Sequence, residues 1–174
     1  MEVSIVKSIE ILERTPGALL QMVDGVSEDW TSVNEGEGTW SVYDVIGHLI
    51  HAERTDWITR MELILSDIPN KTFHPFDRFA QFQNSKGKSL KQLLIEFQEI
   101  RGLNIEKLKR MDITTNRLIA TGIHPAFGEV TLSQLLATWV VHDLNHIAQI
   151  SRVMAKQYLA AVGPWKEYLG ILKS

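Results

Sequence analysis

The clearest hydrophobic pattern in the chain runs from residue 132 to residue 153. Positions three and four residues apart, most of them apolar, form the buried stripe of an α-helix packed in a bundle. The stripe consists of Leu132, Leu135, Trp139, His142, His146, Gln149 and Val153. Thr131 and Gln134 have the spacing of a capping box at the start of this stripe. The sequence therefore predicts a long helix beginning near residue 131.

Three further segments carry the same helical periodicity. Residues 3–24 form an apolar stripe that Thr15-Pro16 interrupts, so a kink or a restart is expected there. Capping-box patterns open two more predicted helices, residues 41–65 and 89–111. Four long helices without an internal repeat or a linker predict an all-α four-helix bundle that forms a single domain.

The connections between these helices are predicted to be irregular. Residues 27–39 are mostly polar, and residues 112–130 contain turn-forming residues. Residues 66–88 form a long connection in which phenylalanine recurs at every third position, namely Phe73, Phe76, Phe79 and Phe82. A connection of this length is typical of a covering loop. Its phenylalanines either pin the loop to the core or form the wall of a pocket.

Two positions on the 132–153 stripe are histidines one helical turn apart. Positions i and i+4 share a helix face and lie about 6 Å apart along the axis, so His142 and His146 can both reach one metal ion. The alternative is a pair of buried histidines with ordinary hydrogen-bond partners. His48 lies in the middle of the 41–65 helix beside small residues and is the natural third ligand. Three histidines with one open position are typical of a catalytic zinc or nickel site.

The other histidines leave the details of such a site open. His51 lies three residues after His48. As a fourth ligand, it would favour a structural metal site over a catalytic one. His74 and His124 each precede a proline and are interpreted as ordinary loop residues, although His124 comes shortly before the 132–153 helix and could approach the site.

Three charged residues fall on or beside apolar stripes. Glu53 lies on a packed stripe and is therefore expected to need a buried partner. Arg101 is interpreted as a surface residue whose aliphatic stem covers apolar surface, with a buried cation facing a site as the alternative. Asp143 shares an apolar stripe with Leu136 and Val140, so it is expected to be at least half-buried.

Asp143 also suggests a comparison with zinc proteases. The segment from His142 to His146 has the spacing of the HExxH motif, with aspartate in place of the general-base glutamate. Aspartate is one methylene shorter, and no further histidine follows, which disfavours a protease. We expect Asp143 to hold a neighbouring helix or to orient a ligand histidine. A catalytic role as general base is the alternative.

Composition narrows the function classes. The net charge is −3 and no cluster of basic residues forms a stripe, which argues against nucleic-acid binding. The absence of cysteine excludes disulfides, thiolate metal sites and cysteine nucleophiles, and it fits a cytoplasmic location. No apolar run reaches about 18 residues and no signal-peptide pattern opens the chain. No contact with a membrane is therefore expected.

Four segments together resemble the DinB-like superfamily of small metalloproteins. They are TWSVYDVIGHLIHAERTDW, PFDRFAQF, HPAFGEVTLSQLLATWVVHDLNHIAQI and VGPWKEYL. The resemblance covers nearly the whole chain, residues 1–174, as one domain. It implies an up-down-down-up four-helix bundle with a divalent metal site, whose ligands fall on His48, His142 and His146. Members of the family often pair, so a homodimer is a further expectation.

Three functions remain open at this point. Characterised relatives include bacillithiol and mycothiol S-transferases, and an open position on the metal would lower the pKa of a thiol substrate. A thiol-dependent S-transferase is the preferred prediction, with an electrophile bound near Trp57, Phe76 and Trp139. A metal-dependent hydrolase, with Asp143 or His51 as base, is the alternative. The third prediction is a non-catalytic bundle that a metal stabilises and that binds a small molecule.

Overall fold

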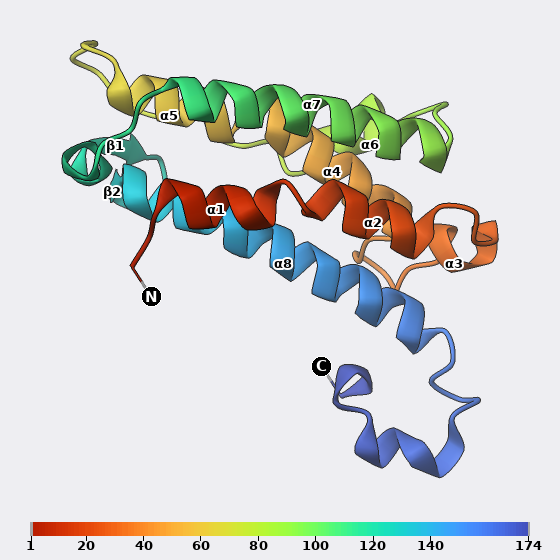
Figure 1. Cartoon of the computed structure of the whole chain (residues 1–174). Coiled ribbons are helices and arrows are strands. Elements are labelled where there is room, and N and C mark those ends of the chain that lie inside the picture. The colour runs from red at the N-terminus through yellow and green to blue at the C-terminus, as the bar shows by residue number, and fades with distance from the viewer. Residues whose placement is uncertain (1, 174) are drawn as a thin grey trace.

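Four helical arms lie side by side in the computed structural model, which describes residues 2–173 (Figure 1). In chain order the arms are α1 (Ile5–Leu12) with α2 (Thr15–Val23), α4 (Val42–Thr55) with α5 (Trp57–Leu65), α7 (Leu90–Arg110), and α8 (Leu132–Lys156). The first and last arms run in one direction and the two middle arms run in the other. The predicted all-α, up-down-down-up bundle is therefore confirmed.

The three longest arms begin where the sequence predicts. At each start the N-cap side chain accepts a hydrogen bond from the backbone N–H three residues later, and the side chain at that later position accepts one from the N-cap backbone N–H. The pairs are Ser41 with Asp44, Ser89 with Gln92, and Thr131 with Gln134. These bonds satisfy N–H groups that have no partner inside the helix. Each reciprocal pair therefore determines where its helix starts.

The apolar core consists of two clusters that follow each other along the bundle. On α8 the first cluster ends at Trp139 and the second begins at Ile150. On α4, Ala52 belongs to the first cluster, and residues 42–50 supply the second. His142 and His146 of α8 thus lie between the two packed apolar regions, and His48 of α4 lies within the span of the second. Close packing on both sides restricts how far these helices can move relative to each other.

The predicted helix 41–65 is interrupted, which corrects the sequence-based expectation. Its first part, α4, ends at Thr55, and α5 begins at Trp57. Between them Asp56 has φ −113° and ψ −73°, outside the usual helical range. Two short helices, α3 (Glu28–Ser32) and α6 (Ala80–Asn84), lie inside connections that the sequence predicts as loops.

A β-hairpin replaces part of the irregular segment predicted at 112–130. After a 3₁₀ turn, η1 (Thr115–Ile119), β1 (Thr121–His124) pairs with β2 (Gly128–Thr131) in antiparallel register. The two strands have four residues each, too few to show the alternating pattern by which strands are predicted. A Cβ at Gly122 would lie 2.6 Å from the Phe73 ring, so glycine allows this hairpin to pack against the covering loop.

The covering loop is held against α4. The Tyr43 hydroxyl contacts the backbone carbonyls of Ser85 and Lys88, at 2.5 and 2.9 Å. A Cβ at Gly47 would lie 2.3 Å from the Ser85 hydroxyl oxygen, so the missing side chain lets the loop approach the helix. Phe73 is buried and pins the loop to the core, as one of the two interpretations expects.

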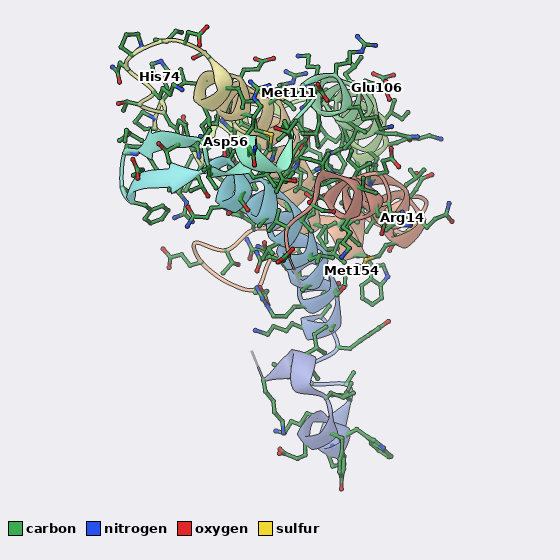
Figure 2. The ribbon with its side chains drawn as sticks, turned by 60° about the vertical axis from the view of Figure 1, so that its left-hand side comes forward. Arg14, Asp56, His74, Glu106, Met111 and Met154 are labelled. Carbon is green, nitrogen blue, oxygen red and sulfur yellow. The ribbon has the colours of Figure 1, made fainter. Side chains whose placement is uncertain are left out.

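The chain continues beyond α8 as a tail with two 3₁₀ segments, η2 (Gly163–Tyr168) and η3 (Gly170–Leu172). Both views show most of this tail lying away from the four arms (Figures 1 and 2). Among residues 2–173, no helix combines the length and the apolar character needed to cross a membrane.

Candidate metal centre

The structure brings the three predicted histidines together. His48 comes from α4, and His142 and His146 come from α8. The Nε2 atom of His142 lies 3.1 Å from Nε2 of His48 and 3.1 Å from Nε2 of His146. His48 and His146 are both buried, with 6% of their surface exposed. Three ring nitrogens from two helices therefore face one point.

One of these rings has a clear orienting contact. Nδ1 of His146 lies 2.8 Å from the side-chain oxygen of Gln149, one turn further along α8. Since that oxygen can only accept, we assign the ring proton to Nδ1, which leaves the Nε2 lone pair directed at His142. The Nδ1 atoms of His48 and His142 are buried without a hydrogen-bond partner among the described residues.

Burial keeps the three imidazoles uncharged. Burial, with a smaller contribution from the neighbouring histidines, lowers the pKa of His48 to about 3 and that of His142 to about 2. The pKa of His146 is lowered by burial too, although Gln149 and Asp143 oppose the shift. At neutral pH all three rings are therefore in the form that binds a metal.

The arrangement fits a divalent metal ion. Tetrahedral ligands about 2.0–2.1 Å from zinc lie roughly 3.3 Å from one another, close to the 3.1 Å between His142 and each of its neighbours. All three ligand atoms lie within 4.8 Å of one another. Each neutral imidazole carries a single ring proton, so the three Nε2 atoms cannot all be satisfied by hydrogen bonds to one another. A cation among them would satisfy all three lone pairs.

The imidazoles form part of the wall of a cavity of about 630 Å³. Three aromatic rings surround them. The Trp40 ring lies 4.8 Å from that of His48, Trp57 lies 5.0 Å from His142, and Phe76 lies 5.4 Å from His48 (centroid distances). Trp57 and Phe76 thus line the cavity as predicted. Phe76 comes from the covering loop and forms part of a pocket wall, which is the second of the two interpretations of the phenylalanines in this loop. Trp139 does not line the cavity, because it is fully buried behind Trp57.

Charged side chains line the rim of the same cavity. Arg152 holds Glu35 through two hydrogen bonds of 2.8 and 2.9 Å, and these lower the pKa of Glu35. Asp56 pairs with Arg60, yet burial raises the pKa of Asp56 to about 6. A second cavity, of about 650 Å³, lies where α2 and α3 meet the starts of α4 and α7, but no histidine lines it.

A family model matches residues 11–150, which is most of the chain, and it describes the DinB superfamily. The chain belongs to the DinB superfamily. YfiT of Bacillus subtilis (strain 168), named as a probable metal-dependent hydrolase, is 27% identical to this DinB-superfamily chain over 151 residues, which are 84% of this chain and 82% of YfiT. The resemblance found in the sequence is thereby confirmed.

Solved structures show the shared fold. The structure of YfiT, described as having an unusual four-helix bundle topology, has a TM-score of 0.75 at 23% identity and covers 90% of each chain. TT2238, a four-helix bundle protein, has a TM-score of 0.56 at 19% identity, over 85% of this chain and 98% of its own. A DinB-like protein from Bacillus cereus ATCC 10987 has the same TM-score at 18% identity, over 88% and 90%.

Asp143 is not brought into the cavity of this DinB-superfamily protein. It is fully buried, and Arg101 binds both of its carboxylate oxygens, at 2.6 and 3.0 Å. The geometry therefore gives no support to Asp143 as a general base. Arg101 is 1% exposed, so its interpretation as a surface residue is wrong. It is buried, as the alternative expects, but it faces the carboxylates of Glu53 and Asp143 and does not line the cavity. Sequence periodicity placed Arg101 beside the apolar stripe, but it did not show whether another segment would cover this side chain.

Glu53 has the buried partners that the sequence led us to expect. Its carboxylate accepts hydrogen bonds from Arg101 at 2.8 Å, from Asn104 at 2.9 Å and from the Trp139 indole at 2.9 Å. Arg101 also donates to the backbone carbonyl of Leu12 at 2.9 Å. We call these residues and Asp143 the Arg101 network. It links all four helical arms.

The remaining histidines lie apart from the three-histidine group. His51 is buried against Phe76, with ring centroids 5.0 Å apart, and it does not line the cavity. His124 does line the cavity, but its ring stacks on Phe127 at 4.4 Å and its Nδ1 accepts a hydrogen bond from the Ala126 backbone. His74 is exposed in the covering loop.

Several residues of the site escaped the sequence analysis. Gln149 stands on the predicted stripe, and its position three residues after His146 is the one available signal for its orienting contact. Trp40 and Asp56 lie at helix boundaries, and Glu35 and Arg152 are 117 residues apart. Short-range periodicity carries no information about such contacts.

Proposed function

We propose that this protein binds one divalent metal ion through His48, His142 and His146 and hydrolyses a small-molecule substrate in the cavity above them. The observation that carries the proposal is the convergence of three uncharged imidazole nitrogens on one point of a cavity wall. The relation to YfiT, named as a probable metal-dependent hydrolase, supports the reaction class.

The residues around the ion would have different roles. An ion held by these three ligands would keep one coordination position open and would supply the Lewis acidity that lowers the pKa of the attacking water. Gln149 keeps the His146 lone pair directed at the centre. Trp40, Trp57 and Phe76 supply an apolar wall for the substrate. Imidazole ligands suit zinc and nickel, which are the ions we propose.

A thiol-dependent S-transferase is the second candidate. The chain has no cysteine, so a thiol at the metal must come from a substrate, and the cavity volume of about 630 Å³ is within the range of small-molecule sites. A low-molecular-weight thiol that accelerates consumption of an electrophile and appears in the product would favour transfer. Hydrolysis that proceeds equally without any thiol would favour the first candidate.

The decisive experiment for the centre is elemental analysis of protein purified without a nickel resin. We expect about one equivalent of metal in the parent protein and none in the His48→Ala or His142→Ala variants. His124→Ala is the matched control, because this histidine lines the cavity but stands outside the three-histidine group. Full metal occupancy in His142→Ala would refute the ligand assignment.

We also propose that the chain works as a single-domain cytoplasmic protein that forms a homodimer. Large apolar side chains are exposed on α8, at Val141 and Leu144, and along the tail, at Tyr158, Leu159, Trp165, Tyr168, Leu169 and Ile171. A second copy of the chain would cover such a surface. Light scattering coupled to size-exclusion chromatography should give twice the 19.8 kDa chain mass; a single-chain mass would exclude the dimer.

A further inference from the structure

Two acidic side chains line the cavity among the residues that the structure describes, and their surroundings differ. Glu35 has both oxygens bound by Arg152, and Lys156 lies 3.2 Å from one of them. Asp56 pairs with Arg60, whose Nε contacts Oδ1. Asp56 Oδ2 has no hydrogen-bond partner in the described part of the chain. Glu35 is therefore saturated, whereas Asp56 retains an oxygen that can accept a proton.

The backbone places Asp56 at the site. The arm formed by α4 and α5 is interrupted at this residue, and the next residue, Trp57, packs its ring against His142. Asp56 lies between the β1–β2 hairpin and the start of α8 (Figure 2). It lines both the histidine cavity and a smaller cavity of about 120 Å³ under the hairpin. Departures from a continuous helix of this kind are frequent at functional sites.

We propose that Asp56 is the catalytic general base of this cavity and that Arg60 is the positioning residue that holds it. The inference rests on the proposed function, because it needs a nucleophile at the three-histidine centre. It replaces Asp143, which is fully buried and bound on both oxygens by Arg101.

The proposed step needs no reactant besides water and the substrate, because Asp56 returns the proton that it accepts. An attacking water gives one proton to the Asp56 carboxylate while its oxygen forms a bond to the substrate carbonyl carbon. The bond to the leaving group then breaks, and the leaving oxygen takes the proton back from Asp56. A thiol substrate would deliver its S–H proton to the same oxygen, so the role does not depend on which of the two reactions operates.

The charged and titratable groups around Asp56 suit this role. Arg60 pairs with Asp56 from α5, and His124 on β1 and His142 on α8 line the same cavity. Burial raises the pKa of Asp56 to about 6, although the Arg60 charge opposes the shift. A base with this pKa is ionised at neutral pH and still accepts a proton readily.

The test compares Asp56→Asn with Asp67→Asn in zinc-loaded protein, with p-nitrophenyl acetate as substrate between pH 5 and pH 9. Asp67 is an exposed acid in the covering loop and serves as the matched control. We expect a loss of kcat of about 100-fold or more in Asp56→Asn, with unchanged zinc content and without the acidic limb of the pH profile. Arg60→Met should move this limb to higher pH, because the charge that lowers the Asp56 pKa is gone.

Carboxyl ¹³C NMR supplies a second measurement that needs no activity. A resonance that is missing from Asp56→Asn should titrate near pH 6 in the parent protein. Activity in Asp56→Asn within twofold of Asp67→Asn, loss of its zinc, or a resonance that titrates below pH 4.5 would each overturn the assignment. An inactive zinc-loaded parent would overturn the proposed hydrolase and the base role with it, whereas an active parent with an equally active Asp56→Asn would overturn the base role alone.

Discussion

Helices α4 and α8 each contribute to two buried polar clusters. The two clusters differ in whether their buried polar atoms find partners within the chain. In the Arg101 network, one guanidinium faces two carboxylates, and the donors of Asn104 and Trp139 point at carboxylate oxygens. In the histidine centre, the three Nε2 atoms point at one another. The network satisfies itself almost completely, with Arg101 Nε as the exception, whereas the histidine centre needs something from outside the chain.

The contrast indicates how to separate structural from functional polar groups in a core. A buried charge is tolerated when an opposite charge and matched hydrogen bonds surround it. Burial lowers the pKa of Arg101, but the charges of Glu53 and Asp143 outweigh burial and raise it above its ordinary value. No such compensation surrounds His48 and His142, whose pKa values fall. Burying rings without such compensation costs free energy. This cost is expected at a site where a bound ligand offsets it.

The largest predicted effect is the loss of stability when a substitution disrupts the Arg101 network. Arg101→Met leaves the carboxylates of Glu53 and Asp143 buried without their counter-charge, so the free energy of unfolding should fall by about 3–5 kcal/mol. Urea denaturation measures this change. Arg110→Met, on an exposed position of the same helix, is the control and should change stability by less than about 0.5 kcal/mol. Equal effects of the two substitutions would mean that the network contributes nothing specific.

A smaller effect is expected at the contact that orients the histidine centre. Gln149→Leu removes the acceptor for His146 Nδ1 and should weaken zinc binding about 10- to 100-fold without unfolding the protein. Zinc titration against a competing chelator measures the Kd. Gln98→Leu, on an exposed position of α7, should leave the Kd unchanged. An unchanged Kd in Gln149→Leu would show that the glutamine does not set the ring orientation.

The third prediction concerns pH and the metal-free protein. His48 and His142 have pKa values of about 3 and 2 when folded, against about 6.5 when unfolded. Below pH 6.5 the unfolded chain therefore binds more protons, and each histidine lowers stability by about 1.4 kcal/mol per pH unit. Asp56, whose folded pKa is about 6 against 3.8, acts in the opposite direction between these two values.

The two histidines outweigh the single aspartate, so a net loss of about 1.4 kcal/mol per pH unit is expected near pH 5. Urea unfolding in EDTA at pH 7, 6 and 5 measures it. His142→Gln should flatten the dependence because it removes one of the two groups. Stability that stays constant or rises as the pH falls would contradict the assignment of neutral, buried rings.

Local sequence patterns determined much of the fold and of the candidate site. The stripe of α8 places His142 and His146 on one face because helix geometry alone fixes the i, i+4 relation. Three capping boxes located the starts of the long helices for the same reason, since each involves residues three apart. His48 could be chosen because its neighbours on α4 are small. The assignment of these three histidines as ligands stays a prediction until the metal is measured.

Tertiary structure alone decided the rest. The burial of Arg101 and the packing of the β1–β2 hairpin against Phe73 depend on contacts between segments far apart in sequence. Arg101 binds Glu53 across 48 residues and Asp143 across 42. A repeat of three or four residues states which side of a helix is covered, but it does not state what covers it. The partner of a buried charge is determined by the packing of the whole chain, and with it whether that charge supports the fold or serves the site.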